Sequence, residues 1–248
     1  MKLLRQSFKI MSPIHEGLLL KVEEAGRTCY KSEDKITTGS AEKFIRMLIK
    51  RGHESVLEHS SITVRFITDR GITHEIVRHR LSSFSQESTR YCNYNSDKHG
   101  NQCTFIIPDW ATHIKEGEYP TIWDDDKDSK IHGMAYDFSG GLPDWFGKST
   151  FEEDIWFNHM AHVEHDYNAM VENGMKPQDA RSVLPNSLKT EIVVTANIRQ
   201  WRTIFKQRTA PAAHPMMRDL MIPLLEELQR IEYTKPFFDD ILCHTKIE

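Results

Sequence analysis

The chain has 248 residues, 39% of them hydrophobic, which is enough to bury a substantial core in one domain or two small ones. Its 32 lysines and arginines are outnumbered by 36 aspartates and glutamates, and the formal net charge is -4. This balance excludes a generally basic chain and disfavours a nucleic-acid-binding coat. Any anion site must therefore be a local cluster of arginines.

The cysteines show neither the spacing of a redox pair nor that of a zinc ribbon; they are Cys29, Cys92, Cys103 and Cys243. We interpret them as reduced thiols of a cytosolic protein. The N-terminal sequence MKLLRQSFKIM interrupts its apolar residues with charged ones, and no apolar run is long enough to span a bilayer. We therefore expect a cytoplasmic protein with no membrane partner.

The first clear helix is predicted over residues 40–51, capped by its serine and ended by Gly52. In residues 61–71, SITVRFITDRG, apolar and polar side chains alternate, which predicts a strand followed by a turn at its last three residues. The next segment, residues 73–82, is expected to form a helix that gives way to a loop.

Residues 96–149 have little sustained periodicity and are interpreted as a surface insertion. Thr150 and Glu153 fit a capping box, which predicts that a long amphipathic helix begins here. The apolar stripe of this helix continues to Gly174, where the helix should end.

Pro177 is expected to open a short helix that stops before Pro185. The sequence KTEIVVTAN, residues 189–197, predicts a strand, and Asn197 can cap the helix that follows it. After a break with two prolines, residues 217–231 predict a final amphipathic helix.

No internal repeat and no linker rich in Gly, Ser or Pro divides the chain. We therefore predict one α+β domain over residues 1–248, with a central antiparallel sheet flanked by helices. The surface insertion at about residues 96–149 belongs to this domain.

The sequence HEIVRH resembles a zinc-protease helix, but its spacing is wrong. His74 and His79 are five residues apart, and Arg78 would repel a dication. Three further histidines, His159, His162 and His165, follow one another around a helix and are interpreted as solvated or hydrogen-bonded. No metal site is predicted.

Arginines cluster in two regions of the sequence: Arg78, Arg80 and Arg90, then Arg181, Arg199, Arg202 and Arg208. Several planar guanidinium forks, together with a hydroxyl such as that of Ser88, suit a nucleotide phosphate. For any one of these arginines alone, a pair with a surface carboxylate is the simpler interpretation.

Taken together, these residues resemble the flavin-dependent thymidylate synthases. RHRLSSFSQES contains that family's signature of Arg-His-Arg, seven residues and serine. GHESVLEH, ARSVLP and NIRQWRTIFKQR resemble three further family segments in the same order. The resemblance extends from Gly52 to Arg208.

The resemblance implies site residues by position. The flavin would be bound by His53, Ser55, Arg78, His79, Arg80, Gln86, Asn197, Arg199 and Thr203, although the family usually has asparagine or histidine at the last position. The substrate dUMP would be bound by Glu75, Arg78, Gln86, Ser88, Arg90, Arg181 and Arg208. Arg208 would be the activating, catalytic residue.

The family reaction implied is reductive methylation of dUMP to dTMP, with methylenetetrahydrofolate as carbon donor and FAD reduced by NADPH as hydride donor. The resemblance also implies a homotetramer whose active sites draw on more than one subunit. Arg208, directed at the N3 and O2 edge of the pyrimidine, would stabilise the charge that makes C5 nucleophilic. No protein nucleophile is required, and Ser88 has no base obviously placed beside it.

Two other classes of function stay open from the residues alone. One is a non-catalytic nucleotide- or RNA-binding module built on the arginines, and the other is a zinc hydrolase. The colour of the purified protein separates them, because a flavoprotein is yellow. Bound zinc, or RNA binding by a colourless protein, would support one of the alternatives.

Overall fold

The computed structural model describes residues 1–96, 100–119, 121–123, 134–136, 145 and 147–242. The chain divides into two compact units built from interleaved segments. The first unit comprises Met1–Gln6, Ile67–Thr73 and Gln86–Glu191, and the second comprises Ser7–Phe66, His74–Ser85 and Ile192–Glu248. Because the chain passes repeatedly between the units, no single linker separates them.

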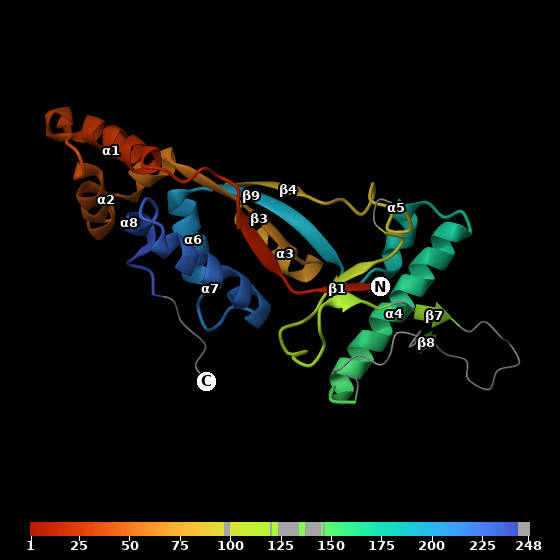
Figure 1. Cartoon of the computed structure of the whole chain (residues 1–248). Coiled ribbons are helices and arrows are strands. Elements are labelled where there is room, and N and C mark those ends of the chain that lie inside the picture. Colours follow the sequence, from red (N-terminus) through yellow and green to blue (C-terminus); the bar gives the residue numbers. More distant parts are fainter. Residues whose placement is uncertain (97–99, 120, 124–133, 137–144, 146, 243–248) are drawn as a thin grey trace, which may run out of the picture. The chain divides into compact units, whose positions relative to one another are not determined.

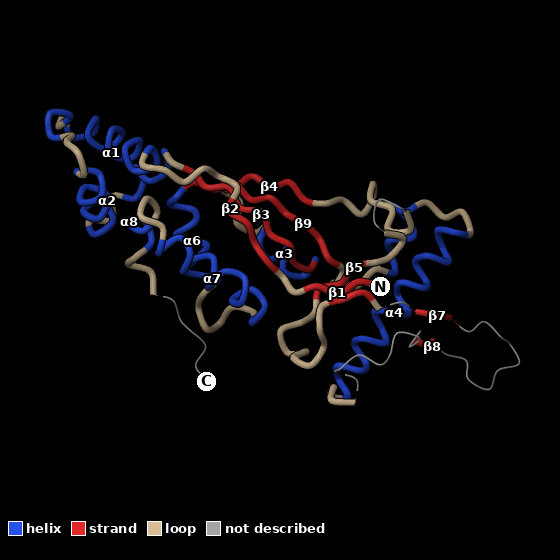
Figure 2. Tube along the Cα trace, in the orientation of Figure 1, coloured by secondary structure: helices blue, strands red, loops and turns tan. Residues whose placement is uncertain are grey.

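The second unit contains most of a four-stranded sheet with the order β2-β3-β9-β4 (Figures 1 and 2), whose residues 67–69, 86 and 189–191 belong to the first unit. Its strands are β2 (Ser7–Ile10), β3 (Ser61–Asp69), β9 (Lys189–Asn197) and β4 (Ser82–Gln86). The helices of this unit are α1 (Gly17–Tyr30), α2 (Ser40–Lys50), α6 (Ile198–Arg208), α7 (Pro215–Arg230) and α8 (Lys235–Phe238). Two 3-10 turns are η1 (Glu33–Lys35) and η2 (Glu54–His59), and helix α3 (Arg70–Ile76) follows β3 directly.

The core of the second unit is centred on Trp201 of α6. Its indole stacks on Phe205 with ring centroids 5.5 Å apart, and its Nε1 donates to the Ile62 carbonyl at 2.9 Å. The alternating buried residues of β3 supply the facing side of this core, including Phe66. The period-two pattern of the strand and the buried stripe of the helix therefore meet at one interface.

The first unit contains a three-stranded sheet with the order β5-β1-β6. Strand β1 (Lys2–Leu4) pairs parallel with β5 (Thr104–Ile106) and antiparallel with β6 (Gly117–Glu118), and a second pair consists of β7 (Thr121–Trp123) and β8 (Met134–Tyr136). The long helix α4 (Phe151–Glu172) is followed by α5 (Pro177–Ala180) and η4 (Arg181–Val183). Leu3, Phe105 and Tyr167 are fully buried in the core of this unit.

The expected α+β class, with a central antiparallel sheet flanked by helices, is confirmed. The strands at 61–69 and 189–197 and the helices α4, α6 and α7 lie where the sequence predicts them. The helix at Ser40 is also present, but Gly39 is its N-cap, and the Ser40 hydroxyl instead donates to Glu23. Whether the whole chain acts as one domain stays a prediction.

The helix expected over 73–82 is wrong in its boundaries. Asp69 Oδ1 accepts the Ile72 N–H at 2.6 Å, so α3 begins directly after β3 and no turn intervenes. The helix ends at Ile76, and the serine-rich segment that was expected to be a loop is β4, hydrogen-bonded beside β9. With Phe84 as its only large apolar residue, β4 lacks the alternation that marks a strand in sequence.

Part of the segment expected to be a surface insertion lies in the core of the first unit. Cys103, Phe105, Ile107 and Ile114 are buried, and β5 is the partner of β1. A three-residue strand is too short to produce a visible period in sequence. Residues 97–99, 120, 124–133, 137–144 and 146 of that segment lie outside the described residues.

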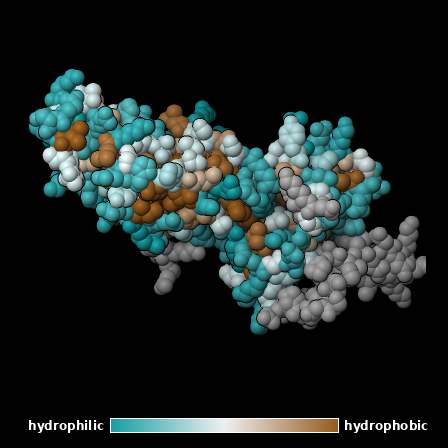
Figure 3. Space-filling model, turned by 45° about the horizontal axis from the view of Figure 1, so that its top comes forward, coloured by the Kyte–Doolittle hydropathy of each residue, from teal (hydrophilic) through white to brown (hydrophobic). Residues whose placement is uncertain are grey.

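Among the described residues, no helix combines the length and the apolar character needed to cross a bilayer. The face of the molecule drawn in Figure 3 is mainly hydrophilic, with apolar side chains gathered in separate patches.

Helix α4 offers a direct test of local stability at its predicted capping box. Thr150 Oγ1 accepts the Glu153 N–H at 3.3 Å, and Glu153 Oε2 accepts the Thr150 N–H at 2.7 Å. We expect Thr150→Ala to lower the free energy of unfolding by about 1 kcal/mol, measured by urea denaturation. Thr150→Ser keeps the acceptor and should remain near the parental value; equal loss in both variants would contradict the cap.

Candidate functional site

Helix α6 ends at Arg208, whose guanidinium group contacts two residues at and just beyond the end of α3. Its Nη1 lies 2.7 Å from Glu75 Oε2, and its Nη2 donates to the Glu75 backbone carbonyl at 3.1 Å. Its Nε donates to His79 Nε2 at 2.9 Å. Three residues of the expected ligand-binding set thus meet within the second unit, and 19% of the Arg208 side chain remains exposed.

His79 is neutral in this arrangement. Because its Nε2 accepts the hydrogen bond from Arg208, its proton is on Nδ1. Burial of the ring, together with the positive charge of Arg208, lowers the pKa of His79 from 6.5 to about 4. His79 therefore cannot hold a phosphate by charge pairing at neutral pH, and only its Nδ1–H is left for a ligand.

The two arginines that flank His79 are exposed. Within the described part of the chain, neither Arg78 nor Arg80 has a side-chain hydrogen bond or an ion-pair partner. Val77 and Leu81 beside them are also exposed, Leu81 to 77%. The signature segment thus presents two unpaired cationic forks next to apolar surface, which suits a ligand with both phosphates and a ring system.

His53 lies directly before η2 and contacts the last residue of α1. The Tyr30 hydroxyl is 2.5 Å from His53 Nδ1, and the two rings are stacked with centroids 6.2 Å apart. With the phenol as donor, His53 carries its proton on Nε2. The ring is exposed, as is Ser55 two residues later, so both of these expected flavin residues are accessible.

Three more of the expected flavin residues lie at the N-cap of α6 and in its first two turns. Asn197 caps the helix, as predicted: its Oδ1 accepts the Gln200 N–H at 2.8 Å, which leaves its Nδ2 as a donor. Arg199 is paired with Glu58 at 2.6 Å and is exposed. Thr203 is exposed and donates its hydroxyl to the Arg199 carbonyl at 3.2 Å, so only its lone pairs are left for a ligand.

Gln86 belongs to the first unit, at the end of β4. Its Nε2 donates to Thr73 Oγ1 at 2.9 Å and to Thr190 Oγ1 at 3.3 Å. These two contacts fix the orientation of the amide and leave its oxygen as an acceptor.

The loop after Gln86 carries two other residues expected to bind dUMP. Ser88 Oγ accepts the Arg90 N–H at 3.3 Å, and the Arg90 guanidinium lies 5.5 Å from the Tyr91 ring centroid. Arg181 of η4 donates to Thr89 Oγ1 at 3.1 Å and so ties this loop to η4. In the described residues, neither arginine is paired with a carboxylate, so both keep their charge for an anion.

The zinc interpretation conflicts with these contacts. The Nε2 lone pair of His79 is occupied by a permanent cation, while His74 is exposed. No group of three or more His, Cys, Asp or Glu residues in the described chain could hold a metal ion. His162 is hydrogen-bonded to the Asn158 carbonyl at 2.7 Å, in agreement with its expected role on α4.

Several partners of the expected site residues were not identified from the sequence. Tyr30 precedes His53 by 23 residues and lies on a different helix. Thr73 lies in α3 and Thr190 in β9, and Thr89 directly follows the last residue of the signature without being part of its pattern. Only the fold brings these hydroxyls to their partners, and no local motif marks them.

Comparison with known proteins places the chain in a family. The family model described as "Thymidylate synthase complementing protein" matches residues 16–232. The chain is 35% identical over 217 residues to a flavin-dependent thymidylate synthase of Mycolicibacterium vanbaalenii, with 86% of this chain and 76% of that protein covered. It is 31% identical over 223 residues to one of Corynebacterium aurimucosum, with coverages of 88% and 78%.

Solved structures share the fold at lower identity. A UMP/dUMP methylase PolB from Streptomyces cacaoi, bound with 5-Br dUMP, superimposes with a TM-score of 0.67 at 20% identity and covers 97% of each chain. Thymidylate synthase X from Helicobacter pylori, with FAD and dUMP, gives 0.65 at 20% identity, with 96% of this chain and 100% of that chain covered. From the family match and the sequence identities, the chain belongs to the family of flavin-dependent thymidylate synthases.

Proposed function

We propose that this chain methylates dUMP to dTMP, with methylenetetrahydrofolate as carbon donor and with FAD, reduced by NADPH, as hydride donor. The family membership supports the reaction and the flavin. The observation that carries the assignment of the catalytic residue is the Arg208 cluster with Glu75 and His79. By family resemblance, the enzyme works as a homotetramer in the cytoplasm, with no nucleic acid or membrane as partner.

Arg208 is suited to stabilise negative charge on a pyrimidine. It is a permanent cation, only partly exposed, and its guanidinium plane is fixed by Glu75 and His79. A preorganised cation in a partly desolvated position costs no reorganisation when charge develops on the ring, so it favours the transition state over the ground state. The neutral imidazole of His79 orients the guanidinium without competing for the substrate as a second cation.

The residues expected to hold FAD fit its chemistry. The unpaired forks of Arg78 and Arg80 supply charge-assisted donors for a pyrophosphate. The accessible His53, Ser55 and Asn197 supply neutral polar contacts. Arg199 and Thr203 complete the set on α6, with Gln86 and His79 as further contacts. When bound, a reduced flavin supplies hydride chemistry that no amino-acid side chain offers.

The proposed dUMP set is rich in arginine. Its members are Glu75, Arg78, Gln86, Ser88, Arg90, Arg181 and Arg208. The unpaired arginines supply the charge that a phosphate dianion requires, and the Ser88 hydroxyl supplies a neutral donor.

Covalent catalysis by the protein is disfavoured on chemical grounds. The candidate base His79 has its Nε2 occupied and a pKa of about 4, so it is poorly suited to activate a serine. Burial, followed by the nearby Glu164 carboxylate, raises the pKa of the Cys103 thiol far above the physiological range. Ser88 is therefore assigned as a phosphate ligand.

The purified protein should be yellow and should bind FAD. Exchange of Arg78 or Arg80 for alanine removes a charge-assisted contact worth about 1.5–3 kcal/mol and should weaken FAD binding by about one to two orders of magnitude. Fluorescence titration of the apoprotein measures this change, and His53→Ala should lower flavin retention in the same assay.

Arg230→Ala is the matched control, because the ion pair of this exposed arginine among the described residues is with Glu226 on its own helix, and its loss should leave FAD binding unchanged. Full flavin content and full dTMP formation in His53→Ala would refute the assignment of that residue. A colourless protein that binds RNA or contains zinc would refute the proposed function.

Arg208→Ala and Arg208→Lys should both reduce turnover by about 10²- to 10³-fold, the scale seen on loss of an oxyanion donor. Lysine keeps the charge but loses the planar fork, so it is the sharper of the two variants. Steady-state kinetics at saturating dUMP measures the loss. Arg208→Ala should also raise the pKa of His79, because one of the two causes that lower it is removed; NMR titration of the ring measures that change.

Gln207→Ala, at the exposed neighbouring position, should keep the parental rate. Near-parental turnover in both Arg208 variants would make Arg208 structural, and Arg181 and Arg90 would become the candidates for the activating cation.

Ser88→Ala should weaken dUMP binding by about one to two orders of magnitude, because one hydrogen bond to a charged group is worth roughly 1.5–3 kcal/mol. Turnover at saturating dUMP should remain measurable. Equilibrium binding and steady-state kinetics separate the two effects, with the exposed Ser85→Ala as control. Complete loss of turnover at normal dUMP affinity would instead support a nucleophilic serine.

A further inference from the structure

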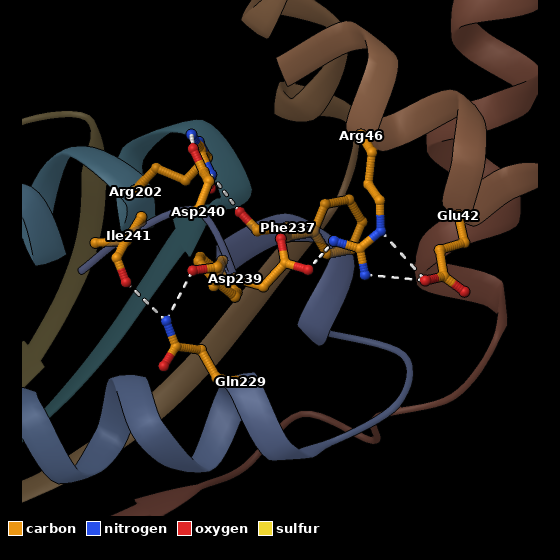
Figure 4. Close-up of polar contacts among 9 residues, drawn as sticks. Glu42, Arg46, Arg202, Gln229, Phe237, Asp239, Asp240 and Ile241 are labelled. Atoms are coloured by element: carbon orange, nitrogen blue, oxygen red, sulfur yellow. Dashed lines mark hydrogen bonds and ion pairs between the residues drawn. The ribbon is translucent and has the colours of Figure 1, made fainter. Parts of the chain in front are cut away.

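Arg202 on α6 is a buried cation that the proposed reaction does not use. Its side chain is only 2% exposed, and its two terminal nitrogens lie 2.6 and 2.7 Å from the two carboxylate oxygens of Asp240. Its Nη1 also donates to the Phe237 carbonyl (Figure 4). Burial alone would raise the pKa of Asp240, but the hydrogen bonds and charge of Arg202 outweigh it and lower that pKa.

The same short segment is also held by two other helices. Asp239 pairs with Arg46 of α2, and Gln229 of α7 donates to the carbonyls of Phe238 and Ile241, each at 2.9 Å (Figure 4). The segment from Phe237 to Ile241 is thus fixed from three sides. Of the three side chains Arg202, Arg46 and Gln229, Arg202 is the one that also forms an ion pair with η2 in the described part of the chain.

The remaining nitrogen of Arg202, Nε, faces Glu54 Oε1 at 3.4 Å. This is an ion-pair distance, and Nε has no hydrogen-bond partner in the described structure. Lys206, one turn further along α6, lies 3.9 Å from the same oxygen. At the other end of η2, Glu58 pairs with Arg199 at 2.6 Å. Helix α6 therefore contacts both ends of η2 through opposite charges.

These contacts link the two groups of residues expected to hold the flavin. Glu54 lies between His53 and Ser55, while α6 carries Asn197 and Arg199. A 3-10 turn of six residues has poor internal hydrogen bonding, so its position depends on contacts with its surroundings. A shift of η2 against α6 would change the spacing of the flavin contacts without changing any of the contacting residues.

We propose that Glu54 and Arg202 are positioning residues of the flavin site, which fix η2 against α6, and that Asp240 holds Arg202 in the orientation that reaches Glu54. This inference rests on the proposed function, because it assigns the role of residues around the FAD contacts. Arg202 itself is too deeply buried to touch a ligand. A buried guanidinium keeps its geometry only while its partners remain charged and in place.

The test compares FAD affinity of the apoprotein in Glu54→Gln, Asp240→Asn and the parent chain. Glu54→Gln is isosteric, and the buried Val56 and Leu57 still anchor η2, so the variant should fold. We expect the Kd for FAD to rise about tenfold in both variants. FAD should also raise the Tm of the parent more than that of either variant, because the stabilisation by a bound ligand grows with the logarithm of its concentration divided by Kd.

Asp239→Asn is the matched control. It releases the same segment from α2, and its partner Arg46 is much more exposed than Arg202. Among the described residues Arg46 pairs with Glu42 and Asp239 and with no charged residue of η2, so FAD affinity should change less than about twofold. If Asp239→Asn and Asp240→Asn weaken FAD binding equally, the cause is a general loss of order in the segment from Phe237 to Ile241, and the inference is overturned. Parental affinity in Glu54→Gln would also overturn it. Failure of the parent chain itself to bind FAD would refute the proposed function instead.

Discussion

The burial of Trp201 against strand β3 fixes helix α6, and most of the proposed chemistry depends on where that helix lies. The indole stacks on Phe205 and donates to the Ile62 carbonyl, while Asn197 caps the helix directly after β9. With one face immobilised in the core, the residues on the other faces have fixed directions. The positions of Arg199 and Arg208, at the two ends of the helix, are therefore consequences of hydrophobic packing.

Two arginines of α6, Arg202 and Arg208, differ in burial and therefore in the role that each can take. Arg202 is almost fully buried, and its acceptors all come from the protein; removal of a charge from water costs several kcal/mol unless it is paired in this way. Arg208 is partly exposed, and its partners hold its plane without covering it. The first arginine is suited to hold structure in place, and the second to meet a ligand.

The sequence predicted those parts of the fold whose patterns are long and regular. The strands at 61–69 and 189–197 were predicted correctly because apolar and polar residues alternate along them. Helices α4 and α6 were predicted correctly because each has an apolar stripe that begins after a capping residue. Strand β4 was missed because it is polar and is defined by its pairing with β9. Family motifs marked Glu75, His79 and Arg208 as expected site residues, but their mutual contacts join segments far apart in sequence that only the fold brings together. The same holds for the contacts from Asp240 through Arg202 to Glu54.

His79 is neutral because it is buried beside Arg208, and this affects the pH range over which it stabilises the fold. In the folded chain the pKa of His79 is about 4, below the ordinary 6.5. Between pH 4 and pH 6.5 the imidazole is therefore protonated in the unfolded chain and neutral in the folded chain. The stability contributed by the neutral ring is therefore complete above about pH 6.5 and is lost as the pH falls toward 4. Above that window His79 stays neutral. The hydrogen bond that orients Arg208 thus stays the same at neutral pH, and the proposed activating cation needs no proton transfer to be ready for its substrate.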